Sequence, residues 1–250
     1  MPAIIQIENL THRFPDGTNG LDRVSLDVEE GSFVVIAGAN GSGKTTLLRH
    51  LNGLLLPTSG LVRVAGMPVA GHLVRARTLV GMMFQDPDSQ IVGETVYEDI
   101  AFGPENLKLG RVEIDQRVQE AMAATGLAHL AEKRPHLLSG GERRRLAIAG
   151  VLAMRPRVIV FDEPFSSLDY GGVRQVLEQI LRLHRAGHTI LLTTHDLDKV
   201  LAHADRLVFM AAGRIEGEGP PLSLVAAAEA FGVRRPRAAS LGVEVLSWLN

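Results

Sequence analysis

Residues 38–45 read Gly-Ala-Asn-Gly-Ser-Gly-Lys-Thr and fit the pattern G-x-x-x-x-G-K-[ST]. An apolar run, residues 33–37, leads into this segment. A run with helical character, residues 45–51, leaves it and stops at Asn52-Gly53. A buried strand, a glycine-rich turn and a helix in this order predict a loop whose backbone N–H groups bind phosphate oxygens at the start of the helix.

The residue types of this loop suit a nucleotide phosphate. Glycines let the backbone approach an anion closely, and the Lys44 ammonium adds a mobile positive charge for β- and γ-phosphates. The Thr45 hydroxyl is placed for Mg²⁺. The expected phosphate-binding residues are Gly38, Ala39, Asn40, Gly41, Ser42, Gly43, Lys44, Thr45 and Thr46.

A second polar feature follows the apolar run 158–161, which ends in Asp162-Glu163. Two adjacent carboxylates are costly to bury unless a positive charge lies beside them. Nucleotide-bound Mg²⁺ would supply that charge, so that Asp162 orients the metal's water shell and Glu163 polarises the attacking water. Alone, such a pair is more typical of a solvated turn, but a phosphate loop in the same chain favours the catalytic interpretation.

A third feature, Leu138-Ser139-Gly140-Gly141-Glu142, comes directly before a helical run that ends at residue 154. Serine, two glycines and an early acid are typical of a helix N-terminus. The exposed N–H groups of such an end also form an anion site. Because the chain already has a phosphate loop, we expect a dimer in which this end closes on the γ-phosphate held by the other subunit.

The distribution of apolar runs predicts an α/β fold with an inserted helical lobe. Helical periodicity replaces the strand signal between Phe84 and Pro156, most clearly over residues 111–125 and 141–154. The expected strands are residues 4–7, 24–28, 33–37, 158–161, 189–193 and 207–210.

Composition excludes several classes of protein. With 250 residues and 46% hydrophobic content the chain can fill a sizeable core, and its lack of cysteine excludes disulfides and zinc thiolate sites. A net charge of −2 gives no general attraction to nucleic acid, and we expect Arg143, Arg144 and Arg145 to form a solvated collar on a helix. We expect no signal peptide or membrane span, so that any link to a membrane goes through a partner.

The order of phosphate loop, Gln85, LSGGE, apolar-Asp-Glu and a late His195 resembles the nucleotide-binding subunit of an ATP-binding cassette (ABC) transporter. The resemblance runs from about Ile4 to Gly219. It implies a P-loop NTPase of the ABC ATPase fold over residues 1–219, with a helical subdomain at about 86–156. Residues 220–250 would be a short C-terminal extension.

The same resemblance implies roles for individual residues. Phe14 would stack on adenine, Gln85 would touch Mg²⁺ or water and sense a transmembrane partner, Asp169 would be the D-loop aspartate, and His195 would contact the γ-phosphate. Taken alone, Phe14 fits a core, Gln85 a surface amide and His195 a strand end. The implied catalytic residues are Lys44, Gln85, Glu163 and His195; the implied nucleotide contacts include Ser139, Gly140, Gly141, Glu142 and Asp169; the implied metal ligands are Thr45, Gln85 and Asp162.

Two positions depart from the family pattern. Glu142 stands where glutamine is commonest, and Tyr170-Gly171 follows the D-loop where proline is usual. The first departure should not abolish closure, because the backbone N–H groups and Ser139 supply the implied contacts. The second leaves the conformation of the dimer-facing loop open, since tyrosine does not fix φ as proline does.

Residues 81–92, 96–106 and 51–55 resemble a narrower group, the ATPases of energy-coupling factor (ECF) transporters. In that group two ATPase subunits dock on a transmembrane T component, and an S component binds a vitamin or a cobalt or nickel ion. The segment after Gln85 would line the docking groove. Its apolar residues could equally be core of the helical lobe; they are Ile91, Val92, Val96, Ile100 and Phe102.

The resemblance thus implies an Mg²⁺-dependent ATP hydrolase that powers an importer from the cytoplasmic face of the cell membrane. The alternatives are the ATPase of a conventional binding-protein-dependent importer, a non-transport ABC protein and a nucleotide-gated binder. Glu163 and His195 argue against a pure binder, which needs neither. Homodimer or paired similar ATPase, and the transported substrate, stay open. In the extension, residues 222–231 predict an amphipathic helix, residues 234–237 a break, and residues 241–249 a resumed apolar spacing.

Overall fold

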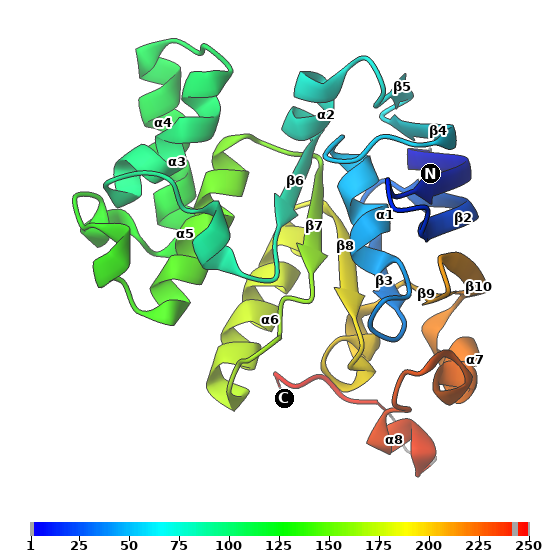
Figure 1. The fold of residues 1–250 in the computed structure, drawn as a ribbon. Coiled ribbons are helices and arrows are strands. Elements are labelled where there is room, and N and C mark those ends of the chain that lie inside the picture. Colours follow the sequence, from blue (N-terminus) through cyan, green and yellow to red (C-terminus); the bar gives the residue numbers. More distant parts are fainter. Residues whose placement is uncertain (1–2, 242–244, 250) are drawn as a thin grey trace.

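The computed structural model describes residues 3–241 and 245–249. Its larger sheet contains the buried apolar runs, with strands in the order β10-β9-β3-β8-β7-β6 (Figure 1). All pairs are parallel except β9 with β10. The bounds are β3 Phe33–Ala37, β6 Val80–Met83, β7 Val158–Asp162, β8 Thr189–Thr194, β9 Arg206–Ala211 and β10 Arg214–Gly219. Every residue of β3, β7 and β8 is buried, as expected of parallel strands covered on both faces.

A second, antiparallel sheet has the strand order β2-β1-β4-β5. Its bounds are β1 Ala3–Arg13, β2 Asn19–Glu29, β4 Ser59–Val64 and β5 Met67–Pro68. The predicted strands at residues 4–7 and 24–28 are confirmed within β1 and β2, as are the four predicted strands of the larger sheet. Sequence patterning missed β4, β5, β6 and β10, which are short or, in β10, rich in exposed polar residues.

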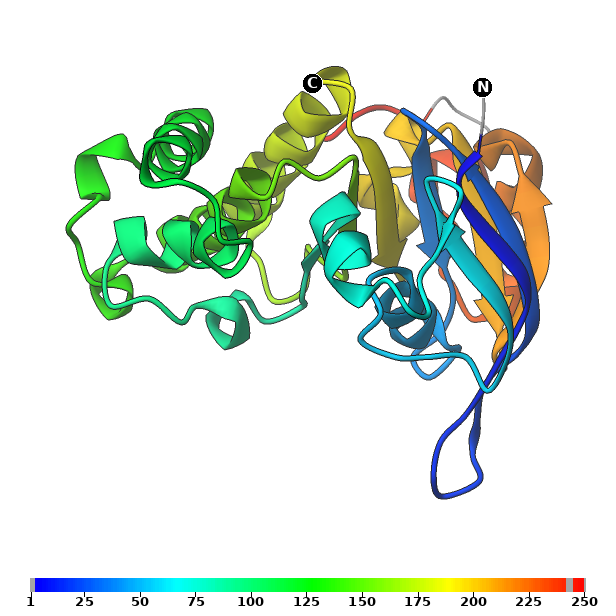
Figure 2. The same ribbon diagram turned by 90° about the horizontal axis from the view of Figure 1, so that it is seen from above.

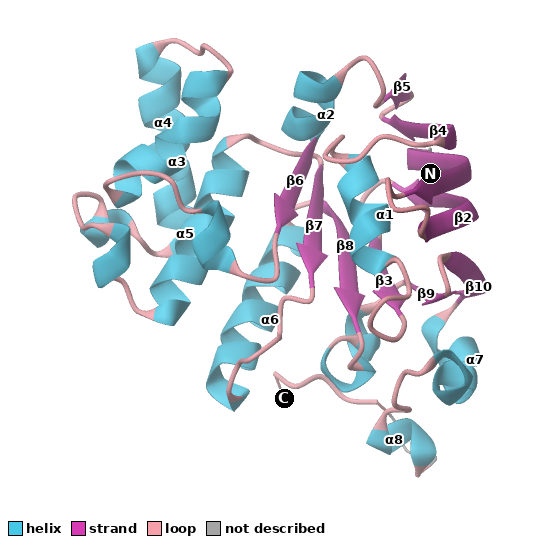
Figure 3. Ribbon diagram, viewed as in Figure 1, coloured by secondary structure: helices cyan, strands magenta, loops and turns pink. Residues whose placement is uncertain are grey.

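Helices cover both faces of the larger sheet (Figure 3). Helix α1, Lys44–Leu51, packs its leucines into one hydrophobic cluster with both sheets. Helix α6, Tyr170–Arg185, packs on the opposite face of the larger sheet through a second cluster. A short helix α2, Leu73–Leu79, leads into β6. The carboxyl ends of the parallel strands are thus left open as one edge.

Three further helices stand beside the sheets and share their own hydrophobic cluster (Figure 2). They are α3 Val96–Asn106, α4 Arg111–Thr125 and α5 Gly140–Ala153. The predicted helix at 111–125 is confirmed, and that at 141–154 is displaced by one residue. The limits of about 86–156 for a subdomain stay a prediction.

The chain after β10 contains α7 Pro221–Leu224, a 3-10 helix Val225–Phe231 and α8 Arg237–Ser240. The predicted helix at 222–231 is therefore only partly α-helical. The predicted break at 234–237 ends where α8 begins, and part of the apolar spacing at 241–249 lies outside the described residues. Within residues 3–241 and 245–249, no helix combines the length and apolarity that crossing a membrane requires.

Candidate functional site

The phosphate loop joins β3 to α1 and sits at the carboxyl end of β3. Its glycines are required sterically. A side chain at Gly38 would come within 2.2 Å of the Met210 carbonyl oxygen, and one at Gly43, whose φ is 102°, within 2.8 Å of the Gly20 carbonyl oxygen. The loop therefore packs against two neighbouring backbones while its N–H groups stay at the start of α1.

A pocket of about 430 Å³ opens beside this loop. Lys44, at its floor, is 6% exposed and donates hydrogen bonds to the carbonyl oxygens of Gly38 and Ala39 at 2.8 and 3.0 Å. The lining residues are Phe14, Thr18, Asn19, Gly20, Asn40, Gly41, Gly43, Lys44, Thr45, Thr46, Gln85, Glu163, Ser166 and His195. The pocket thus brings together the phosphate loop with Phe14, Gln85, Glu163 and His195, which are distant in sequence and were predicted to serve one nucleotide.

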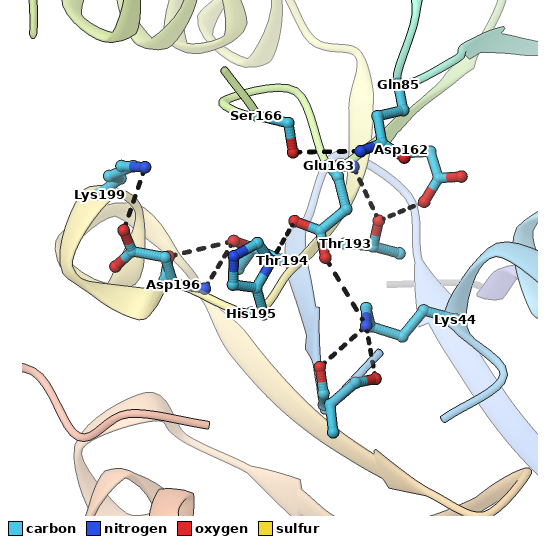
Figure 4. Close-up of polar contacts among 12 residues, drawn as sticks. Lys44, Gln85, Asp162, Glu163, Ser166, Thr193, Thr194, His195, Asp196 and Lys199 are labelled. Carbon is cyan, nitrogen blue, oxygen red and sulfur yellow. Dashed lines mark hydrogen bonds and ion pairs between the residues drawn. The ribbon is translucent and has the colours of Figure 1, made fainter. Parts of the chain in front are cut away.

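Glu163 occupies the turn after β7 in a left-handed conformation, with φ 48°. Its Oε1 lies 3.6 Å from Lys44 Nζ and is buried without a hydrogen-bond partner among the described residues. Its Oε2 lies 3.0 Å from His195 Nδ1, and the neutral or charged ring donates there when Nδ1 carries the proton (Figure 4). The Glu163 carboxylate therefore lies between the Lys44 ammonium and the His195 ring, at the wall of the pocket.

The carboxylate of Asp162 is held by two hydroxyls. Thr45 Oγ1 donates to Asp162 Oδ1 at 3.0 Å, and Thr193 Oγ1 donates to the same oxygen at 2.7 Å. The Thr193 oxygen also accepts the N–H of Glu163 at 3.0 Å. Thr193 therefore fixes both acids, a role that sequence analysis did not assign. The contact arises because β7 and β8 pair in parallel and bring Asp162 level with Thr193, which the local sequence pattern does not show.

Gln85 lies exposed at the edge of the pocket, after β6. Its Nε2 donates to Ser166 Oγ at 3.5 Å, a second contact that sequence analysis did not predict (Figure 4). Thr45, Asp162 and Gln85 supply the hydroxyl, carboxylate and amide oxygens that suit Mg²⁺, so the donor set fits the expected ion. The described residues contain no group of three or more histidine, aspartate or glutamate side chains that could hold a metal ion unaided.

Phe14 lines the outer part of the pocket. Its ring meets the ring of His12 edge-on at 4.8 Å between centroids. Gly20 lies so close that a side chain there would come within 2.7 Å of the Phe14 ring. The ring is consequently held in place, half-buried, at the wall of the pocket.

The LSGGE residues and Asp169 are not among the residues that line this pocket. Ser139 and Glu142 form a reciprocal cap of α5: Ser139 N donates to Glu142 Oε2 at 2.7 Å, and Glu142 N to Ser139 Oγ at 3.3 Å. These bonds lower the pKa of Glu142 below its ordinary value. Asp169 caps α6 by accepting the N–H of Gly172 at 2.7 Å. Within one chain the predicted nucleotide contacts therefore lie apart: some line the pocket, and the others lie at the starts of α5 and α6.

The predicted collar of three arginines is wrong in detail. Arg143 donates to Asp88 Oδ1 at 2.7 Å and to the Leu138 carbonyl oxygen at 2.6 Å, and one terminal nitrogen of Arg144 is buried. These side chains are held because α5 packs against α3 and α4 and also against the turn that follows Gln85. Arg143 thereby links that loop to the start of α5.

Comparison with known proteins agrees with this geometry. The ABC transporter family model matches residues 21–166, more than half of the chain. An energy-coupling factor transporter ATP-binding protein, EcfA, of Methanocaldococcus jannaschii is 43% identical over 250 residues, covering 98% of this chain and 89% of the relative.

Two solved structures are similar in fold. The cbiO1 protein of Clostridium perfringens, described as part of the ABC transporter complex cbiONQ, matches with a TM-score of 0.83 at 36% identity, covering 97% of this chain and 99% of that one. A dimeric ATP-binding cassette in a post-hydrolysis state with ADP and Pi matches with a TM-score of 0.76 at 28% identity, covering 87% and 98%. The chain belongs to the ABC transporter ATP-binding family and is an ATP-hydrolysing cassette of that family.

Proposed function

We propose that this chain is the ATPase subunit of an ECF-type importer for a vitamin or a cobalt or nickel ion. The observation that carries the proposal is the likeness to EcfA and to cbiO1 over nearly the whole chain. In this proposal the chain works at the cytoplasmic face of the membrane. It is held there by a transmembrane T component, while an S component binds the substrate.

The proposed chemistry uses the pocket beside the phosphate loop. Phe14 stacks on adenine, residues 38–46 hold the phosphates, and Thr45, Asp162 and Gln85 hold Mg²⁺, which supplies positive charge to phosphate oxygens when bound. Glu163 accepts a proton from the attacking water, and His195 steadies both the Glu163 carboxylate and the γ-phosphate. Lys44 leaves its carbonyl partners to meet the phosphates.

The separation of Ser139–Glu142 from this pocket supports a dimeric site. Each chain supplies a phosphate loop to one nucleotide and the exposed end of α5 to the other, so ATP closes the dimer and hydrolysis releases it. Asp169 lies at the start of α6 on the side that the second chain approaches in this proposal.

A groove between the sheet and the helical lobe suits the T component. It has a volume of about 250 Å³. Leu54, Val92 and Phe102 line it and are 45%, 59% and 51% exposed, which is unusual for such side chains. Of the apolar residues predicted here, Val96 and Ile100 are instead core, and Ile91 is partly buried against that core. The core alternative thus holds for Val96 and Ile100, and in this proposal Val92 and Phe102 stay available to the T component.

A tagged pull-down from native membranes tests this function, with co-purifying proteins identified by mass spectrometry and ATPase activity measured on the same sample. Recovery of a small integral-membrane S component together with a T component is the expected result. Recovery with a conventional permease pair would keep the ATPase chemistry and overturn the ECF assignment. A Phe102→Asp variant should lose the membrane partners, whereas Val112→Asp, at a residue 83% exposed on α4, should retain them.

A further inference from the structure

The segment after β10 follows the carboxyl edge of the parallel sheet, the same edge that carries the nucleotide pocket (Figure 1). It is anchored there by apolar contacts. Val225, Ala228 and Val233 are buried in the cluster that also holds α6, and the Phe231 ring stacks on Phe209 at 4.9 Å. The segment is therefore packed on the cassette.

This segment touches the phosphate loop first. Gly232 has a φ of 69°, and a side chain there would come within 3.0 Å of Ala39 Cβ. Ala39 is one of the two residues whose carbonyl oxygens accept hydrogen bonds from Lys44. Gly232 thus lies against the part of the phosphate loop that accepts hydrogen bonds from Lys44.

Next it pairs with the loop that carries His195. Arg234 forms a parallel β-bridge with Asp196, the residue directly after His195. The N–H of Arg237 then donates to Asp198 Oδ1 at 3.1 Å. Asp196 is also tied to Thr194 and Lys199, so the whole turn is restrained (Figure 4).

Its end reaches the start of α6. The Trp248 ring lies 5.5 Å from the Tyr170 ring, and Arg174 donates to the Leu249 carbonyl oxygen at 3.3 Å. Ser247 Oγ lies 2.9 Å from His203 Nε2. Tyr170 directly follows Asp169 and is the residue that replaces the usual proline, so the departure from the family pattern coincides with the docking point of the chain end.

We propose that residues 232–241 and 245–249, here named the C-terminal strap, set the conformation of the two loops that carry Asp169 and His195. Trp248 acts through Tyr170, and Arg237 acts through Asp198; both Trp248 and Arg237 are positioning residues. The inference rests on the proposed roles of Asp169 and His195. The strap contacts the phosphate loop, the His195 loop and the start of α6. Because these contacts are closely packed, a displacement of one of them shifts the strap and thereby the other two.

Steady-state ATP hydrolysis by Trp248→Ala, Tyr170→Ala and the double variant tests the strap. Each single variant should lower kcat by about 3- to 10-fold with the KM for ATP unchanged. The double variant should be no slower than either, since both substitutions remove the same contact between the Trp248 and Tyr170 rings. Trp248→Phe should restore kcat, because it keeps an aromatic partner for Tyr170. The matched control is Leu246→Ala, which removes a side chain that is 59% exposed on the same strap and should leave kcat unchanged.

A merely structural role predicts a different pattern. Trp248→Ala would then lower the melting temperature and the folded fraction, while kcat per folded molecule stayed at the wild-type value. Tyr170 is 59% exposed, so Tyr170→Ala keeps the test readable even if Trp248→Ala folds poorly. Wild-type kcat in Tyr170→Ala, or additive losses in the double variant, would overturn the inference.

The contact with the His195 loop has its own test. Asp198→Ala removes the acceptor for the Arg237 N–H and should lower kcat by about 3-fold or more, whereas Asp198→Asn retains a carbonyl oxygen and should restore it. Equal kcat in both variants would contradict a positioning role. Failure of the proposed catalytic roles is distinguishable, because Glu163→Gln and His195→Ala would then hydrolyse ATP at the wild-type rate whatever the strap variants do.

Discussion

The two predicted nucleotide-binding regions of this chain are built differently. The phosphate-loop region is partly buried and its polar groups bond to one another: Lys44 and Asp162 are 6% and 5% exposed, Lys44 lies 3.6 Å from Glu163, and Asp162 accepts a hydrogen bond from Thr45. The LSGGE region is an exposed helix end whose polar bonds go to its own cap. The contrast supports the proposal that the phosphate-loop region binds ATP within one chain, whereas the LSGGE region meets a phosphate only when a second chain brings one to it.

The largest expected effect separates catalysis from binding within the first region. Glu163→Gln removes the proton acceptor while keeping the shape of the side chain, so turnover should fall by about 100- to 10,000-fold. ATP binding should persist, because the phosphate contacts of the loop remain. Steady-state hydrolysis and equilibrium binding of labelled ATP check the two quantities.

The control for this variant is Glu216→Gln, an equivalent change at an exposed residue of β10. It should keep wild-type turnover. Full turnover in Glu163→Gln would remove Glu163 from the catalytic role.

The next effect sharpens the contrast between the two regions. Gly141→Asp places a negative charge at the start of α5, and a Cβ added there meets nothing closer than 3.7 Å, so the fold should persist. Turnover should drop by about 10- to 100-fold through repulsion of the second chain's phosphate, with ATP binding to a single chain unchanged. Lys44→Ala should show the opposite pattern: ATP binding by a single chain should itself be lost.

Gly141→Ala is the matched control, since it adds a side chain without the charge. The difference between the two regions would vanish if Gly141→Asp weakened ATP binding by the isolated chain as much as Lys44→Ala does.

A smaller effect is expected from Thr193→Val. The substitution removes the hydroxyl that serves both Asp162 and the N–H of Glu163. The Glu163 N–H then loses this acceptor, and Asp162 Oδ1 keeps the Thr45 hydroxyl, so we expect a cost of about 1–3 kcal/mol in the free energy of unfolding. Chemical denaturation measures it. Thr193→Ser keeps the hydroxyl and loses only the methyl group, so it should recover most of the stability. A loss in Thr193→Ser as large as that in Thr193→Val would contradict the dominant role of the hydroxyl.

The smallest effect concerns the loop between the pocket and the lobe. Asp99, 8% exposed, accepts the N–H groups of Val92 and Gly93 at 2.7 and 2.9 Å. Burial raises the pKa of Asp99, although these two hydrogen bonds oppose the rise. The native state therefore binds the proton more tightly than the unfolded state, and the contribution of Asp99 to stability decreases as pH rises from its ordinary pKa through the raised one.

Asp99→Asn keeps an oxygen for both N–H groups and removes the charge. Its stability relative to the wild type should thus increase with pH and be greatest above the raised pKa. Denaturation at about pH 4 and about pH 7 compares the two proteins. If the stability of Asp99→Asn relative to the wild type decreased as pH rose, folding would lower the pKa of Asp99 and the prediction would be contradicted.

Local sequence patterns predicted most of what depends on neighbouring residues. The phosphate loop, the acids after β7 and the cap of α5 are each contained in a few successive positions, so spacing alone identified them. Thr193 and Ser166 were missed as site residues because their roles arise from strand pairing and from a contact across the pocket. The strap was missed for the same reason: Trp248 meets Tyr170 only after the whole sheet has formed.

The division of one nucleotide site between two chains is tested most directly by mixing two defective chains. Lys44→Ala lacks a working phosphate loop and Gly141→Asp lacks a working LSGGE end, each in a Glu163→Gln background that retains ATP. Light scattering with ATP should show monomers for each variant alone and dimers for the mixture, because one complete site is then formed. ATP-dependent dimers of Gly141→Asp alone, equal to those of Glu163→Gln, would contradict the divided site.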